Sequence, residues 1–340
     1  TGSTTTVNVS GTGPMPLKAL STSIKTIAST GTGVLTVAVA DRASTALTIT
    51  GGLGNDAIGM ENAGDVLDGG LGTDSLDLDI AGILGGIQID MGAADQITTI
   101  DGVANAAVQT GFETIDVSGY TGFGAIIDGR NSTTTIDTVT GTGSSDRITL
   151  KKGADVLTMT AGNDVIDLGA GDDIINASAT LIEAHSGTSS TITGGTGANT
   201  LNITAATTGL ADADFRGITN IQTLTLVNGT NTVVTGSNAT TAGIVTITGG
   251  TGADKVTTDA GAQTVNFGTG TDTIIYSAAG QTATFTMGDA ATSVSTVGMD
   301  IINGLVAGDD IELSMYTNAA DNTPAAGKAA GDDLRLIAQN

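Results

Sequence analysis

Aspartates recur along part of this chain every nine residues, a spacing that would bring several carboxylates together. Four of them fall on one such lattice, and an isoleucine or leucine stands two places after each. The four are Asp146, Asp155, Asp164 and Asp173, and Gly153, Gly162 and Gly171 stand two places before the last three. Carboxylate and carbonyl oxygens gathered in a flexible cage suit calcium, a hard cation with six to eight oxygen ligands.

Two further stretches repeat this glycine, aspartate and apolar pattern. The first starts at Gly51 and carries Asp56, Asp65 and Asp74, and the last starts at Gly249 and carries Asp254 and Asp272. Calcium blocks are therefore predicted at 51–79, 140–176 and 249–276. With the aspartates, the turn glycines complete the candidate metal site, because stacked turns also present backbone carbonyls. They are Gly52, Gly54, Gly70, Gly72, Gly153, Gly162, Gly169, Gly171, Gly250, Gly252, Gly268 and Gly270.

Each nonapeptide combines a tight glycine turn with a very short strand whose large apolar residue points inward. Nine residues make half a coil, so turns eighteen residues apart should stack on one edge and turns nine apart should lie on opposite edges. The expected facing pairs are Asp56 with Asp74, Asp146 with Asp164, Asp155 with Asp173, and Asp254 with Asp272.

Two turns depart from the pattern. Gln263 stands where the third block should have an aspartate, so that edge is expected to lack a good site. The segment 194–199 copies the turn with Asn199 in place of aspartate and with no partner turn, which favours a structural turn over a calcium site. Zinc is excluded as the metal, because the chain has one histidine and no cysteine.

These repeats resemble the calcium-binding repeats of RTX proteins, which bacteria export by type I secretion. Residues 300–314 resemble a segment that often follows RTX blocks, with Leu305 in place of the usual aromatic residue. Residues 111–117 resemble the G-x-E-T-x-x-V units of bacterial surface-layer proteins. The resemblance implies several calcium ions, export from the cell and a place outside it at the bacterial surface.

The predicted fold class is all-β, a right-handed parallel β-solenoid with embedded calcium-binding β-rolls. Aromatic residues make up 2% of the chain, which suits a narrow core of stacked aliphatic side chains with phenylalanines as plugs. Residues 34–39, 46–50 and 245–248 alternate as short strands do, and a helix is compatible with the sequence near Glu183. We expect 1–340 to be one continuous solenoid region of a larger secreted protein, with separate β modules as the alternative.

Charge and hydropathy exclude several partners. The net charge is −24, and the eleven Lys and Arg residues are scattered, so nucleic acid binding is not expected. No run of 18 apolar residues suggests a membrane span. Crowded carboxylates should repel one another until a divalent ion bridges them, so calcium removal is expected to unfold the rolls.

The residue types do not favour catalysis. His185 is the only histidine, lacks the G-x-S-x-G turn of hydrolases and is expected in an exposed loop. We therefore predict no enzyme but a structural component of a surface layer that associates with itself. The alternatives are the extender or binding segment of an RTX adhesin, with a cell-surface polysaccharide as a candidate partner, and the C-terminal secretion domain of an exported enzyme. Irregular residues at the third and fifth repeat positions argue against an ice-binding face.

Overall fold

The computed structural model describes residues 5–18, 20–38, 45–80, 84–186, 190–258, 263–269, 272–276, 283–286 and 301–303. Contacts divide the chain into two compact units. The first comprises Thr1–Ile175 and Thr191–Gly197, and the second comprises Asn176–Ser190 and Ala198–Asn340. Strands dominate both units, which confirms the all-β prediction. The prediction of one continuous solenoid over 1–340 stays a prediction.

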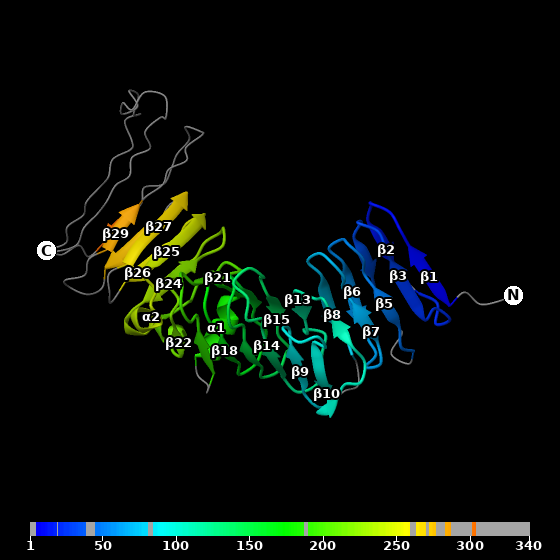
Figure 1. Cartoon of the computed structure of the whole chain (residues 1–340). Coiled ribbons are helices and arrows are strands. Elements are labelled where there is room, and N and C mark those ends of the chain that lie inside the picture. The colour runs from blue at the N-terminus through cyan, green and yellow to red at the C-terminus, as the bar shows by residue number, and fades with distance from the viewer. Residues whose placement is uncertain are drawn as a thin grey trace, which may run out of the picture. The chain divides into compact units, whose positions relative to one another are not determined.

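A long parallel sheet runs through the first unit, with each strand contributed by a successive coil (Figure 1). Its strands in order are β2 (Met15–Leu17), β4 (Leu35–Val37), β6 (Ala57–Met60), β8 (Ser75–Leu78), β13 (Thr114–Asp116), β15 (Thr138–Thr140), β17 (Val156–Thr158) and the start of β19 (Ile174–Ala177). Ile115 aligns with Leu76 on one side and with Val139 on the other, so like residues stack along the sheet.

The intervening strands of the first unit form two shorter sheets. One runs β1 (Thr6–Val9), β3 (Thr26–Ser29), β5 (Thr48–Thr50), β7 (Val66–Asp68) and β12 (Gln109–Thr110). The other runs β11 (Val103–Ala104), β10 (Ile97–Ile100), β9 (Ile87–Asp90), β14 (Ala125–Asp128), β16 (Arg147–Thr149), β18 (Val165–Asp167) and β20 (Thr191–Thr193). Since consecutive repeat strands alternate between sheets and pair in parallel, the chain winds as a parallel β-solenoid.

One excursion departs from parallel pairing. Strand β10 pairs antiparallel with both β9 and β11, at the place where one short sheet gives way to the other. The buried Gln96 closes this break, because its amide nitrogen donates to the Phe112 carbonyl at 2.8 Å and its oxygen accepts the Phe112 N–H at 3.0 Å. The nine-residue pattern does not extend over this segment.

The second unit also builds on parallel strands. One set runs β21 (Thr200–Ile203), β23 (Thr223–Thr225), β25 (Thr246–Thr251), β27 (Gln263–Thr269) and β29 (Ala283–Thr286), and another runs β24 (Thr232–Thr235), β26 (Lys255–Thr258), β28 (Thr273–Tyr276) and β30 (Ile301–Asn303). The helix α1 (Ala179–His185) falls where a helix was compatible with the sequence, and the 3₁₀ helix η1 (Asp212–Phe215) packs against it and against α2 (Ser237–Ala242). The short strand β22 (Ile218–Thr219) lies between η1 and β23 in the chain.

The apolar lattice of the repeats forms the core of each coil. Ile148, Leu157, Ile166 and Ile175 are all buried, as predicted. Burying one such side chain stabilises a fold by about 1.5–3 kcal/mol, so a column of them holds successive coils together. Phe112, Phe215 and Phe267 are buried plugs, but Phe123 is 72% exposed, which corrects the expectation for that residue.

Candidate metal centre

Six acidic residues line one edge of the first unit. Each of them immediately precedes a strand of the long sheet, so the parallel register stacks them one coil above another. We name this set the acidic column. Its members are Asp56, Asp74, Glu113, Asp137, Asp155 and Asp173.

A repeated contact ties the column together. The carboxylate of one residue accepts the backbone N–H of the residue one coil earlier. Asp56 donates its N–H to Asp74 Oδ1 at 2.6 Å, and Asp155 donates to Asp173 Oδ1 at 2.8 Å. Glu113 acts in the same way, since its Oε2 accepts the N–H of Asp74 at 2.8 Å. The predicted facing of Asp56 with Asp74 and of Asp155 with Asp173 is therefore confirmed.

The other two predicted pairs show the same contact. Asp146 donates its N–H to Asp164 Oδ1 at 2.9 Å, and both residues precede strands of the sheet that contains β16 and β18. Turns nine residues apart therefore lie on opposite edges, as expected. In the second unit, Asp254 donates its N–H to Asp272 Oδ1 at 2.9 Å.

Most of the predicted turn glycines adopt conformations that other residues avoid. Positive φ angles occur at Gly52, Gly70, Gly72, Gly153, Gly162, Gly169, Gly171 and Gly252. A side chain at Gly171 would collide with the Gly153 carbonyl oxygen, so the turns stack too closely for any Cβ. Gly250 pairs with Gly268 across β25 and β27, Gly54 packs on the Gly33 carbonyl, and Gly270 lies outside the described residues.

Three members of the acidic column each have one carboxylate oxygen that is available to bind a cation. Among the described residues, Oδ2 of Asp56, of Asp74 and of Asp155 is buried and has no hydrogen-bond partner. Asp56 Oδ2 and the Gly69 carbonyl oxygen both lie where a side chain on Gly51 would stand, so the glycine leaves these two oxygens room to approach each other. An unpartnered buried carboxylate oxygen is costly, and a calcium ion coordinated by such oxygens would remove that cost.

Burial opposes ionisation of these carboxylates in the metal-free chain. It is the main cause that raises the pKa of Asp74 and of Asp155 to about 7, and neighbouring carboxylates add to the rise. The pKa of Asp164 and of Asp173 rises to about 6, again mainly through burial. A divalent cation reverses this preference, because it stabilises the ionised form directly.

The donor set fits calcium better than other metals. Within the described ranges, no group of three or more Asp, Glu, His or Cys side chains converges as a metal cluster. Ions at the stacked turns would therefore bind one or two carboxylates together with backbone carbonyl oxygens. This set of hard oxygen ligands, most of them uncharged, suits calcium.

Asp137 and Glu113 were missed as members of the column. Asp137 lies nine residues before Asp146, on the same lattice, but Thr135 replaces the glycine that stands two places before the aspartate in other repeats. In the sequence, Glu113 stands out only as part of the surface-layer-like motif at 111–117. The register across the long sheet is what joins both residues to the aspartates.

The turn at 194–199 has a partner after all. Gly171 donates its N–H to the Thr196 carbonyl at 2.9 Å, and Thr196 donates to the Gly169 carbonyl at 2.8 Å. The expectation of an isolated turn was wrong because the segment with α1 lengthens this coil beyond eighteen residues. Gln263 is buried with its oxygen accepting a hydrogen bond from the Thr235 hydroxyl, so this amide serves a structural contact.

His185 is not an exposed loop residue. It ends α1, is only 2% exposed, and burial lowers the pKa of its imidazole. The expectation was wrong because residues around Glu183 form a helix that packs against η1 and buries Ala179, Ile182 and His185.

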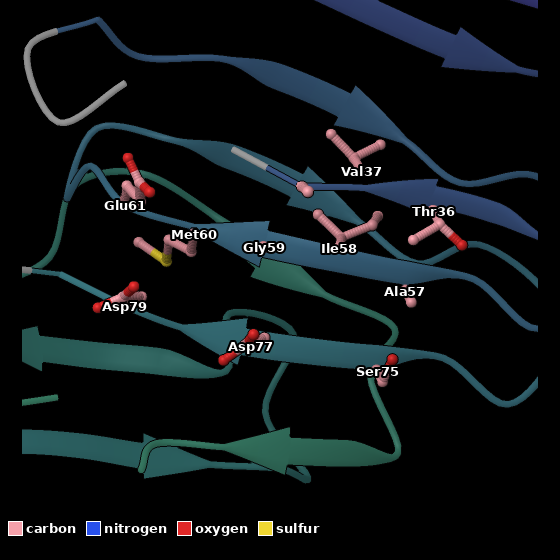
Figure 2. Close-up of a pocket in the computed structure, with 11 residues that line it drawn as sticks. Thr36, Val37, Ala57, Ile58, Gly59, Met60, Glu61, Ser75, Asp77 and Asp79 are labelled. Atoms are coloured by element: carbon pink, nitrogen blue, oxygen red, sulfur yellow. The ribbon is translucent and has the colours of Figure 1, made fainter. Parts of the chain in front are cut away.

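A hollow on the outer face of β4, β6 and β8 is a second acidic feature of the first unit. Figure 2 shows Glu61, Asp77 and Asp79 around it, with Gly59 leaving space in the middle. Burial raises the pKa of Asp77, with Asp116 and Asp79 contributing. Asp77 and Asp79 remain exposed, so the hollow is a solvated surface and differs from the buried corners of the acidic column.

Comparison with known families supports the repeat assignment. The family described as RTX calcium-binding nonapeptide repeat (4 copies) matches residues 132–159, 153–179 and 242–274. These matches cover the second predicted block and residues 249–274 of the third, whereas 51–79 lies outside them. No curated protein and no solved structure matches the chain.

The chain is therefore a β-solenoid protein that carries RTX calcium-binding nonapeptide repeats. It binds calcium at several of these repeats. RTX repeat proteins are typically exported. No helix in the part of the chain that the structure describes has the length and apolar character to span a bilayer.

Proposed function

We propose that this protein is a calcium-dependent structural component of a bacterial cell surface, similar in role to a surface-layer protein, and that it is not an enzyme. Export by type I secretion would deliver it to calcium-rich surroundings, where ion binding completes folding. The ions would be held by Asp56, Asp74, Asp155, Asp173 and their counterparts at Asp146, Asp164, Asp254 and Asp272, together with carbonyls of the stacked glycine turns.

The acidic column is the observation that carries this proposal. It extends beyond the matched repeats through Glu113 to Asp74 and Asp56, so that calcium would stiffen a long run of coils in the first unit. A terminal secretion signal needs no such extended support. A structural element of a cell surface does need such support along its length.

Exposed apolar side chains on the first unit support self-association. Leu71, Leu84 and Phe123 are 68%, 80% and 72% exposed. Phe123 donates its N–H to the Gly85 carbonyl at 3.1 Å, so Leu84 and Phe123 lie on neighbouring coils. We take Leu84 and Phe123 as the candidate contact with a second copy of the chain.

Electron microscopy of the purified protein, with calcium and then with chelator, tests the proposal. We expect ordered sheets in calcium that dissolve when the ion is removed. A protein that folds with calcium yet stays monomeric at every concentration would contradict self-assembly and favour the extender segment of an adhesin. Leu84→Ser with Phe123→Ser should abolish the sheets without changing calcium-driven folding, while Val103→Ser, an exposed residue of the β11 hairpin, serves as the control.

A further inference from the structure

Arg130 places a positive charge inside the acidic column. Its side chain is 16% exposed and lies between Glu113 and Asp137. Nη1 donates to Asp137 Oδ1 at 2.8 Å, and Nη2 lies 3.3 Å from Glu113 Oε1. Nη2 also donates to the backbone carbonyl of Phe112. The backbone N–H of Arg130 donates to the second Asp137 oxygen.

The guanidinium thus collects the same kinds of ligand that the glycine turns offer to calcium. These are carboxylates from two successive coils and one backbone carbonyl. Arginine suits this position because its planar fork is always charged and bonds several oxygens at once. A calcium ion would meet the same oxygens with twice the charge and no covalent tether.

The hydrogen bonding of the column changes where Arg130 stands. Asp137 is fully buried, and both of its carboxylate oxygens accept hydrogen bonds from Arg130. Its column neighbour Asp155 is not satisfied in the same way. Among the residues that the structure describes, its Oδ2 has no hydrogen-bond partner. The charge of Arg130 reaches that neighbour as well, since it lowers the pKa of Asp155 against the effect of burial.

We propose that Arg130 is a positioning residue that replaces a calcium ion between Glu113 and Asp137. This junction then folds without metal and keeps the repeat blocks at 51–79 and 140–176 in register while their own turns await calcium. The inference rests on calcium binding by the repeats and is independent of the surface role.

Hydrogen exchange on the full chain in chelator, read strand by strand by mass spectrometry, tests this inference first in the unaltered protein. Amides of β13 and β15, which flank Arg130, should exchange at least about tenfold more slowly than those of β17 and β18. Addition of calcium should then protect β17 and β18 strongly and β13 and β15 little. Equal loss of protection across all four strands in chelator would overturn the proposal.

Arg130→Gln then asks whether the charge is responsible. In chelator, β13 and β15 of this variant should exchange as fast as β17, and millimolar calcium should restore their protection, with one more ion bound per chain by calorimetry. Arg147→Gln is the matched control, because Arg147 is an exposed arginine on the neighbouring β16 and should leave the exchange pattern unchanged. Two results would overturn the proposal: unchanged protection in Arg130→Gln, or a loss that calcium does not restore.

Discussion

Asn231 in the second unit and Asp155 in the first occupy the same kind of corner, the turn just before a strand, but their side chains are hydrogen-bonded differently. Each immediately precedes a strand, and each uses one side-chain oxygen to accept a backbone N–H from the coil before, from Thr207 at 3.1 Å and from Asp137 at 2.8 Å. The two side chains differ in their other terminal atom, which is Nδ2 in Asn231 and Oδ2 in Asp155. Nδ2 of Asn231 donates to the Val227 carbonyl at 2.9 Å and to the Gly229 carbonyl at 3.3 Å, and it also donates to Asp254 Oδ1 at 2.8 Å.

At Asp155 that atom is a carboxylate oxygen, which cannot donate to a turn carbonyl and repels it instead. A cation between the two oxygens resolves the conflict. One atom therefore decides whether a corner is completed by hydrogen bonds or depends on calcium. Asp137 shows a third solution, in which a guanidinium supplies the cation from within the chain.

Calcium removal should change the relative stability of the two kinds of corner more than any single substitution. At a free concentration one thousand times its dissociation constant, each ion stabilises the folded chain by about 4 kcal/mol. Chelation should therefore unfold the coils with carboxylate corners before the corner at Asn231 opens, as circular dichroism and limited proteolysis can show. A chain that keeps all its strand signal in chelator would contradict the account.

Asp164→Ala should weaken calcium-driven folding more than Asp95→Ala. The first change removes a buried carboxylate that accepts the Asp146 N–H, worth about 1.5–3 kcal/mol apart from the lost ion. Asp95 lies outside the blocks and accepts a single N–H from Gln109 at 3.2 Å. Calcium titrations followed by circular dichroism measure the difference, and equal midpoints would count against the periodic corners.

Asp155→Asn should convert a calcium corner into one like Asn231. The amide keeps the acceptor for the Asp137 N–H and replaces the unpartnered oxygen with a donor. We expect the calcium-free protein to gain about 1 kcal/mol of stability at neutral pH while one ion is lost from the calcium stoichiometry. Denaturant unfolding in chelator and calorimetric titration provide both values. Asp155→Asn with unchanged stoichiometry would show that this carboxylate holds no ion.

The pH dependence should have opposite signs with and without calcium. In the calcium-free chain the pKa of Asp74 and of Asp155 is raised to about 7. A raised folded-state pKa gives stability that is complete below about pH 4 and is lost as the pH rises through about 7. With saturating calcium the ion replaces the proton, so stability should instead rise with pH. Urea midpoints in calcium-free and calcium-containing buffers decide this, and parallel curves would contradict it.

The sequence predicted the periodic part of the fold well. The nine-residue lattice placed Leu157 in the core, paired Asp155 with Asp173 and put Asp146 on the opposite edge, because strand alternation and turn spacing are local properties. These predictions required only that each repeat make half a coil.

Contacts that cross irregular segments could not be predicted in the same way. The Glu113 carboxylate meets the Asp74 N–H from 39 positions away, across the antiparallel hairpin of β10 and β11. Arg130 stands seven residues before Asp137, a spacing that belongs to no repeat. Only the register of the folded strands brings these residues together. Residue spacing alone therefore could not predict that the acidic column is continuous or that the Arg130 guanidinium lies within it.

A crystal structure of the full chain grown in millimolar calcium tests the central claim most directly. We predict an ion bound to Asp155 Oδ2 and to carbonyl oxygens of the stacked turns at 151–155 and 169–173, and no ion between Glu113 and Asp137, where the guanidinium of Arg130 lies. Ordered water in place of an ion beside Asp155 would contradict the account.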